Sequence, residues 1–276
     1  MSGVLEMIEQ KLFRAREALH LIFRHAADSA TRRELLHIYS SLGNRSAYND
    51  EVNLRMRFGK LVMPCTMRLS DIFILGEILF EDQYKLKSRI PEGATIIDAG
   101  GNVGFSSMLF LGEYQPSQVH VFEPSEDSFR LLSKNLGSAA GVVLNKSAVG
   151  RTSGQSTLHH GEFAGMHSLL QAHGMDGGEI VDVLSLADYM ENCGLTRIDL
   201  LKLDIEGAEL DALIGLGDRI ADVSVIVGEV HEAMVDSDAI YEHLASNSFD
   251  IVWKKYFQEG PVSQVHNFEA RRRGRG

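Results

Sequence analysis

The sequence predicts an α/β protein built on a parallel sheet with helices on both faces. The first observation is a series of short, β-branched-rich runs that begins after Pro91. The second is that segments with helical periodicity follow several of these runs, and strands alternating with helices indicate βαβ units. The third is the composition: 44% hydrophobic and 24% charged residues over 276 positions are near globular averages, so a buried core is expected.

The predicted strands and helices of this region follow one another in a regular order. Three of the strands are each followed by a helix-like segment, which is how parallel strands are connected. The strands are expected at 95–99, 119–122, 142–145, 199–204 and 223–230, and the helices at 104–114, 125–136 and 207–216.

The N-terminal part, residues 1–68, is expected to form a separate helical segment. Residues 4–42 carry one apolar stripe at helical spacing, and Thr31 with Glu34 has the spacing of a capping box for a second helix. A β-like segment at 54–69 and a helix capped by Ser70 or Asp71 follow. This part could cover an acceptor pocket, form a homodimer contact, or simply pack on the sheet. The stripe is Leu5, Ile8, Leu12, Ala15, Leu19 and Ile22.

Composition excludes several classes of function. A net charge of −11 and a pI near 5.5 argue against a nucleic-acid binder. The basic end, residues 270–276, is expected to lie in solvent. Cys65 and Cys193 are too far apart in sequence to suggest a zinc cluster and are expected to be reduced thiols. Glu6 and Glu9 interrupt any apolar leader, and no membrane-spanning run is present, so a cytoplasmic protein without a membrane partner is expected.

A glycine-rich turn between the first strand and helix of the α/β region, IIDAGGNVGFSS, is the first chemical signal. Gly100 and Gly104 would let backbone approach a ligand closely. The spacing differs from GxGxxG, the fingerprint of dinucleotide-binding turns. Asp98 at the strand end would repel a pyrophosphate but suits the ammonium of S-adenosylmethionine, whose carboxylate suits the N–H groups of the turn.

Glu123 is the second signal. It ends the next predicted strand, 25 residues after Asp98. An acidic residue at about this interval from a glycine turn is where a ribose diol is bound. Ribose binding is therefore the preferred role for Glu123, with a solvated loop acid as the alternative.

Acidic residues after the fourth predicted strand form the third signal. Asp204, Glu206 and Glu209 lie near the carboxyl edge of the sheet, where open α/β folds bind ligands. Asp204 ends the strand itself and is the stronger candidate. Glu209 could instead complement a helix dipole.

Glu229 and His231 end the fifth predicted strand, and alternation places their side chains on one face. A lone histidine is more often structural, but one near Asp204 could act as a base.

Taken together and in this order, these segments resemble the FkbM-type methyltransferase family. The resemblance runs from about Ile72 to Phe257. It rests on EILFEDQY, IIDAGGNVGFSS, VHVFEPSEDSFRLLSKNL, EIVDVLSLADYM, DLLKLDIEGAELDAL and VIVGEVHEA.

The resemblance implies a Rossmann-like class I methyltransferase domain at 69–269, with a seven-stranded, mostly parallel sheet and an N-terminal helical extension. It implies S-adenosylmethionine as donor and O-methylation of a sugar or secondary metabolite. One departure is Gly101, where the family often has Ala. The donor site then maps onto Asp98, Gly100, Asn102, Gly104 and Glu123, and the LKLDIEG segment onto residues 202–207.

An aliphatic hydroxyl needs help to lose its proton, so a base is expected near the acceptor. Asp204 and His231 are the candidates, with Glu206 and Glu229 as orienting groups. A divalent cation held by the same acids could acidify the acceptor instead, so the metal requirement stays open. Two other functions also stay open: a nicotinamide-dependent oxidoreductase and a non-catalytic Rossmann-like binding module.

Overall fold

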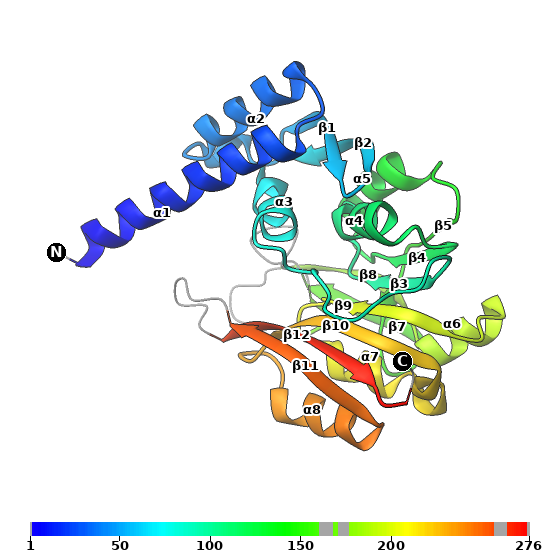
Figure 1. The fold of residues 1–276 in the computed structure, drawn as a ribbon. Coiled ribbons are helices and arrows are strands. Elements are labelled where there is room, and N and C mark those ends of the chain that lie inside the picture. Colours follow the sequence, from blue (N-terminus) through cyan, green and yellow to red (C-terminus); the bar gives the residue numbers. More distant parts are fainter. Residues whose placement is uncertain (1, 160–167, 171–176, 257–263, 275–276) are drawn as a thin grey trace. The chain divides into compact units, whose positions relative to one another are not determined.

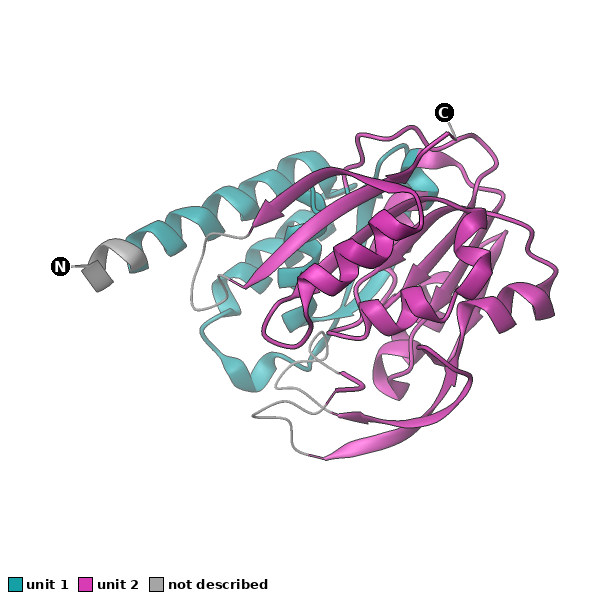
Figure 2. Cartoon of the chain, turned by 90° about the horizontal axis from the view of Figure 1, so that it is seen from below, with its two compact units in different colours: residues 1–84, 111–113 teal, residues 85–110, 114–276 magenta. Residues whose placement is uncertain are grey.

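The computed structural model describes residues 2–159, 168–170, 177–256 and 264–274. The chain forms two compact units, drawn in separate colours in Figure 2. Unit 1 comprises residues 1–84 and 111–113, and unit 2 comprises residues 85–110 and 114–276. Every residue that the sequence assigns to the site belongs to unit 2.

Unit 1 combines helices with a two-stranded antiparallel sheet (Figure 1). The β-like segment is a hairpin, and Pro64 lies within its second strand, opposite Arg55. A π-helical turn, Leu21–His25, follows the first helix. The elements are α1 (Ser2–His20), α2 (Ser29–Ser41), β1 (Glu51–Phe58), β2 (Leu61–Arg68) and α3 (Ile72–Leu79).

One expectation for the N-terminal helices was wrong. Helix α2 is capped by Asp28, whose side chain accepts a hydrogen bond from Thr31 N at 2.8 Å, so Thr31 is not the cap. The helix predicted from the apolar stripe is present as α1, and the stripe is mostly exposed: Leu12 is 59% exposed, and Ile8 and Leu19 are about half exposed, while Ile22 is buried.

Unit 2 contains the seven-stranded sheet, in the order β11-β12-β10-β9-β3-β4-β5. β12 runs opposite to the other six strands, which are mutually parallel, so the predicted mostly parallel sheet is confirmed. The five strands expected from the β-branched runs are all present, within one residue at each end. The strands are β3 (Thr95–Ala99), β4 (Gln118–Phe122), β5 (Val142–Asn145), β9 (Ile198–Leu203), β10 (Val223–His231), β11 (Phe249–Tyr256) and β12 (Val265–Arg272).

Helices cover both faces of this sheet (Figure 1). The core on one face joins strand residues such as Ile97 and Leu201 to buried side chains of the three later helices. The first two helices lie on the other face, where Asp98 and Lys202 are also buried. The helices are α4 (Phe105–Tyr114), α5 (Glu126–Leu136), α6 (Leu186–Cys193), α7 (Glu209–Ile214) and α8 (Ser237–Ser246).

The expectation of a solvated basic end from residue 270 was also wrong. Ala270 is fully buried in β12, between β10 and β11. Arg272 donates from Nη1 to Ile220 O and Asn247 O, both at 3.1 Å. These residues therefore complete the sheet.

A second, three-stranded sheet is inserted between β5 and β9. Its strands are β6 (Ala148–Val149), β7 (Gly154–His159) and β8 (Gly178–Leu184). Among the helices in the described part of the chain, none has both the length and the apolar character needed to cross a bilayer.

Candidate functional site

The glycine turn after β3 is held tightly against the two neighbouring strands. Gly100 has φ +82°, and a Cβ there would lie 1.8 Å from Asp204 O. The N–H groups of Gly100 and Gly101 both donate to Phe122 O, at 3.0 and 2.9 Å. Glycine at position 100 is therefore required by the close approach of β3 to the end of β9.

Asn102 and Gly104 complete the turn with positive φ values, +46° and +102°. A Cβ on Gly104 would lie 3.0 Å from side-chain carbons of Leu132 and Leu136 on α5. A larger residue at this position would therefore disturb packing on α5 and the start of α4, whether or not a ligand is bound.

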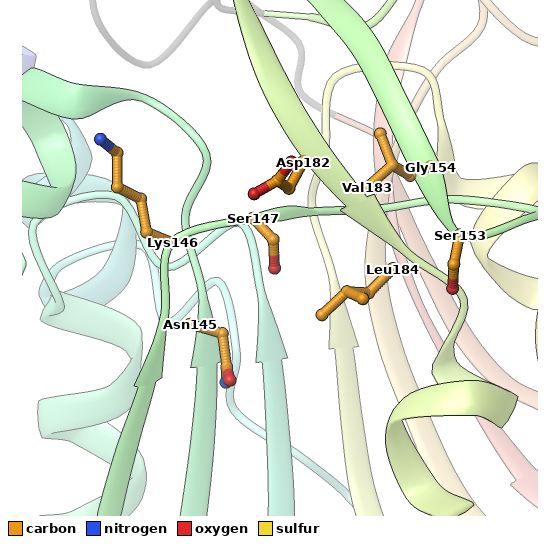
Figure 3. A pocket seen from close by; sticks show the side chains of 8 residues that line it. All are labelled: Asn145, Lys146, Ser147, Ser153, Gly154, Asp182, Val183 and Leu184. Carbon is orange, nitrogen blue, oxygen red and sulfur yellow. The ribbon is translucent and has the colours of Figure 1, made fainter. Parts of the chain in front are cut away.

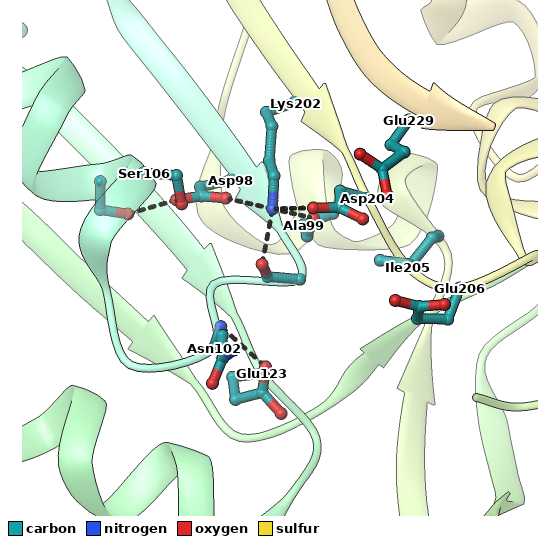
Figure 4. Close-up of polar contacts among 12 residues, drawn as sticks. Asp98, Ala99, Asn102, Ser106, Glu123, Lys202, Asp204, Ile205, Glu206 and Glu229 are labelled. Carbon is teal, nitrogen blue, oxygen red and sulfur yellow. Dashed lines mark hydrogen bonds and ion pairs between the residues drawn. The ribbon is translucent and has the colours of Figure 1, made fainter. Parts of the chain in front are cut away.

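Glu123 lies at the end of β4 and bonds to the glycine turn (Figure 4). Its Oε2 accepts from Asn102 N at 2.8 Å, and its Oε1 accepts from Ser125 N at 2.9 Å. The sequence placed Glu123 and the turn in one site, and the structure brings them into direct contact. The carboxylate thus lies where β3 and β4 both end.

Asp98 is completely buried and faces protein groups. Ser106 Oγ and Ser107 Oγ each donate to Asp98 Oδ2 at 2.6 Å, and Lys202 Nζ is 3.3 Å from Oδ1. This geometry fixes the start of α4 to the sheet. Direct contact of Asp98 with a ligand ammonium stays a prediction.

Lys202 is a central residue that the sequence analysis did not single out. Its Nζ donates to Gly100 O at 2.6 Å and to Ala99 O at 3.2 Å, and it lies 3.7 Å from Asp204 Oδ2. Burial acts to lower the pKa of Lys202, but the charges of Asp98 and Asp204 outweigh it and the pKa is raised. The available signal was a lysine inside the apolar run DLLKLD, a residue type that is almost never fully buried unless paired.

His231 lies between two carboxylates at the end of β10. Its Nε2 is 3.3 Å from Glu206 Oε2 and 3.3 Å from Glu229 Oε1. Burial lowers the pKa of His231, while the charge of Asp204 opposes that shift. Nδ1 is buried without a hydrogen-bond partner among the described residues. The predicted grouping of Glu206, Glu229 and His231 is present in the structure.

Glu209 supports the loop that carries these acids. Its Oε1 accepts from Ile205 N and Gly207 N, each at 3.1 Å, and the side chain is completely buried. Burial raises the pKa of Glu209 to about 7, against the effect of these two hydrogen bonds. These contacts favour a structural role.

Asn267 is a second residue that sequence reasoning missed. It pairs with Glu229 across β10 and β12, so the two side chains share one face of the sheet. Asn267 is fully buried, and neither polar atom of its amide has a hydrogen-bond partner in the described structure. Nothing in the surrounding sequence indicated this placement, because β12 was not predicted as a strand.

Within the described residue ranges, no group of three or more His, Cys, Asp or Glu side chains has the arrangement of a metal site. The divalent cation that the sequence left open gains no support from this geometry. Cys65 and Cys193 are both free thiols, the first buried and the second exposed.

A cavity of about 400 Å³ opens beyond the end of β5 (Figure 3). It adjoins the strand next to Glu123, whose N–H donates to Asn145 O at 3.1 Å. Ser147 Oγ is buried there and has no partner among the residues described. The lining residues are Asn145, Lys146, Ser147, Ser153, Gly154, Asp182, Val183 and Leu184.

Comparison with known proteins finds relatives among methyltransferases. The chain is 29% identical over 246 residues to "Methyltransferase 1" of Beauveria bassiana, covering 81% of this chain and 98% of that protein. It is 28% identical over 240 residues to the 31-O-demethyl-FK506 methyltransferase FkbM of Streptomyces tacrolimicus, covering 72% and 89%. A solved FkbM methyltransferase from Methylobacillus flagellatus superposes with a TM-score of 0.47 at 12% identity, covering 96% of this chain and 60% of that one. The family model of the FkbM methyltransferase domain matches residues 98–252, more than half of the sequence, and the chain belongs to this family.

Proposed function

We propose that this protein transfers a methyl group from S-adenosylmethionine to a hydroxyl of a small acceptor, a sugar or a secondary metabolite. The observation that carries the proposal is the joining of Glu123 to the glycine turn through Asn102 N. This contact sets a carboxylate beside the glycine turn at the ends of two adjacent parallel strands, where α/β sheets bind nucleosides.

The residues present fit the donor. Glu123 supplies a carboxylate for the two ribose hydroxyls, since a carboxylate has about four acceptor positions and can hold backbone N–H groups as well. The cavity beyond β5 supplies a partly polar space for the adenine, with Ser147 Oγ as a hydrogen-bonding group. When bound, S-adenosylmethionine supplies the electrophilic methyl group.

Asp204 is the proposed base for the acceptor. It ends β9, and 23% of its side chain is exposed, so a hydroxyl can reach it. Lys202 Nζ lies 3.7 Å from Asp204 Oδ2 and donates to Gly100 O, which fixes the proposed base relative to the glycine turn. Such positioning is the main contribution a protein makes to an in-line displacement.

His231 is the second candidate base, with Glu206 and Glu229 as orienting groups. Two carboxylates face Nε2, so the hydrogen of the neutral ring is best placed on that atom. The ring would then accept only at the enclosed Nδ1. Asp204 is therefore the preferred base, and His231 is the group that holds the carboxylates of Glu206 and Glu229 in place.

The acceptor class is supported by names and by chemistry. The Streptomyces relative is named for methylating 31-O-demethyl-FK506. The carboxylates of Glu206 and Glu229 beside His231 can accept hydrogen bonds from hydroxyl groups, which suits a hydroxylated acceptor.

Calorimetry with S-adenosylhomocysteine tests the donor site. Glu123→Gln keeps one side-chain oxygen but loses the charge, and it should weaken binding by about 1–3 kcal/mol, the loss of charge-assisted hydrogen bonds. Glu242→Gln, at an exposed position of α8, is the matched control and should bind as wild type does. An unchanged dissociation constant in Glu123→Gln would exclude Glu123 from donor binding and leave it only its structural contacts with the turn.

A further inference from the structure

The outer face of α1 carries an apolar seam that the described structure leaves exposed. Its members are Ile8, Leu12, Ala15 and Leu19, which repeat at alternating steps of four and three. Ile8 is 46% exposed, Leu12 59% and Leu19 54%. This spacing places the four residues at the a and d positions of two heptads, the pattern of a helix that packs on another helix.

The seam differs from the face by which α1 packs within unit 1. Glu17 and Ala18, on that inner face, are buried, and Leu21 and Ile22 continue the burial into the following π-helical turn. Residues 7–12 of the helix are all exposed. A short helix without packing is marginal in water, because its stability comes mainly from burial of an apolar face.

The charges beside the seam argue against a membrane surface as the partner. Helices that lie on membranes concentrate Lys and Arg on their polar face. Here Glu9 accompanies Lys11 and Arg16 on the exposed side, and Arg14 is paired with the buried Glu17, so the signs are mixed.

The same charges distinguish two ways of pairing the seam with a second copy. In a parallel pair, Lys11 of one helix would face Arg16 of the other, and the contact would be repulsive. In an antiparallel pair that matches Leu12 with Ala15, Glu9 of each helix lies within one turn of Arg16 of the other. The two symmetry-related contacts between Glu9 and Arg16 are then attractive.

We propose that the outer seam of α1 pairs with the same seam of a second copy of this chain, with the two helices antiparallel. The arrangement is two-fold symmetric, the usual symmetry of soluble homodimers. It is independent of the proposed methyl transfer and concerns unit 1 alone.

Sedimentation velocity of the full chain tests the pairing. Wild type should sediment at twice the chain mass of 30.6 kDa at micromolar concentration. Leu12→Glu should sediment as a monomer, and the helix should persist because glutamate forms helices well. Leu36→Glu on α2 is the matched control: Leu36 is 58% exposed but lies off the seam, so this variant should remain a dimer.

A charge swap tests the orientation. In the antiparallel pair, Arg16→Glu places a glutamate at position 16 of each helix next to Glu9 of the other. This repulsion should raise the dissociation constant of the dimer about tenfold. Adding Glu9→Arg to this variant should restore wild-type association. Tighter association of Arg16→Glu would indicate a parallel pair and overturn the proposed orientation.

Other outcomes overturn the interface itself. A monomeric wild type at tens of micromolar, or equal dissociation of Leu12→Glu and Leu36→Glu, would exclude the seam. A monomer that binds phosphatidylserine vesicles through Leu12 would assign the seam to a membrane surface instead.

Discussion

Asp204 lies between two groups of residues at the site: the buried ion pair of Lys202 and Asp98, and the two half-buried acids beside His231. The side chain is partly exposed, whereas Asp98 is enclosed. Two aspartates at the ends of adjacent parallel strands thus have different tasks. Burial favours a structural role for Asp98, and the partial exposure of Asp204 is what the proposed base requires.

Replacing Asp204 by Asn should separate donor binding from turnover. The change keeps the size of the side chain and removes the charge that accepts a proton. We expect S-adenosylhomocysteine to bind within a few-fold of wild type and turnover to fall by about 10²-fold or more. Turnover is measured with labelled donor against hydroxylated sugars and polyketide-like compounds. Asp250→Asn, at an exposed pair with Arg273, is the control. Full turnover by Asp204→Asn would exclude Asp204 as the base.

Gly101, where the family often has Ala, is a position at which this chain has no room for a methyl group. A Cβ there would lie 2.2 Å from Val121 Cγ1 on the fully buried face of β4. Gly101→Ala should therefore lower the free energy of unfolding by about 1–3 kcal/mol, the usual cost of overpacking a core. Urea denaturation measures this loss.

Gly43→Ala is the control for this prediction, because a Cβ at Gly43 would meet nothing within 4 Å. Its stability should stay near that of wild type. Equal losses in the two variants would show that backbone freedom, rather than contact with Val121, decides the requirement for Gly101.

At the scale of elements, the connection from β9 to α7 carries the candidate chemistry and depends on one buried acid. Glu206 and Gly207 both have positive φ, +54° and +98°, so the chain turns sharply after the strand. Glu209 reaches back from the first turn of α7 and accepts two N–H groups of this turn. The side chain of Glu209 on α7 therefore fixes the backbone of the loop between β9 and α7.

The raised pKa of Glu209 predicts a pH dependence of stability. The folded value of about 7 exceeds the unfolded value of 4.5, so protonation favours the folded state. This contribution is fully present below about pH 4.5 and is lost as pH rises through 7. Over that interval it amounts to at most roughly 3 kcal/mol.

Glu209→Gln resembles the protonated side chain and should flatten the profile of unfolding free energy between pH 4.5 and 7. Urea denaturation at a series of pH values measures both proteins. A slope that is the same in the variant and in wild type would show that another group titrates in this range.

At the scale of the whole molecule, ligand linkage distinguishes the functions that the sequence left open. A ligand that binds only the folded state stabilises it by about 2.7 kcal/mol at one hundred times its dissociation constant. For a protein of this size that corresponds to a shift of roughly 5–10 °C in the melting temperature. S-adenosylhomocysteine should produce this shift, whereas NAD should not. A shift with NAD alone would favour the oxidoreductase.

The division of the chain also belongs to this scale. We propose that residues 69–269 act as the methyltransferase domain and that residues 1–68 serve association. The compact units of the structure divide between Tyr84 and Lys85, and unit 1 also takes in residues 111–113 of α4.

The sequence by itself determined the parallel core of the fold and identified most residues of the candidate donor site. β-branched runs such as TIIDA can be recognised without tertiary information, because strands buried on both faces need continuous apolar side chains. Gly100 and Glu123 were identifiable for a related reason: the carboxyl ends of neighbouring parallel strands lie at one edge of the sheet. The local sequence pattern and the topology of a parallel sheet together were sufficient to predict these strands and these two residues.

Only the tertiary structure decided the roles of residues whose neighbours are distant in sequence. Strands β11 and β12 were missed because FDIVWKKY and VHNFEARR mix charged and apolar residues, and what fixes them is pairing across the sheet. The positions of Lys202 and Asn267 also depend on contacts with residues distant in sequence, Asp98 for the first and Glu229 for the second. The exposed seam of α1 shows the converse case, since periodicity predicts an apolar face but not what covers it. Burial and partnership depend on long-range contacts, which no local pattern contains.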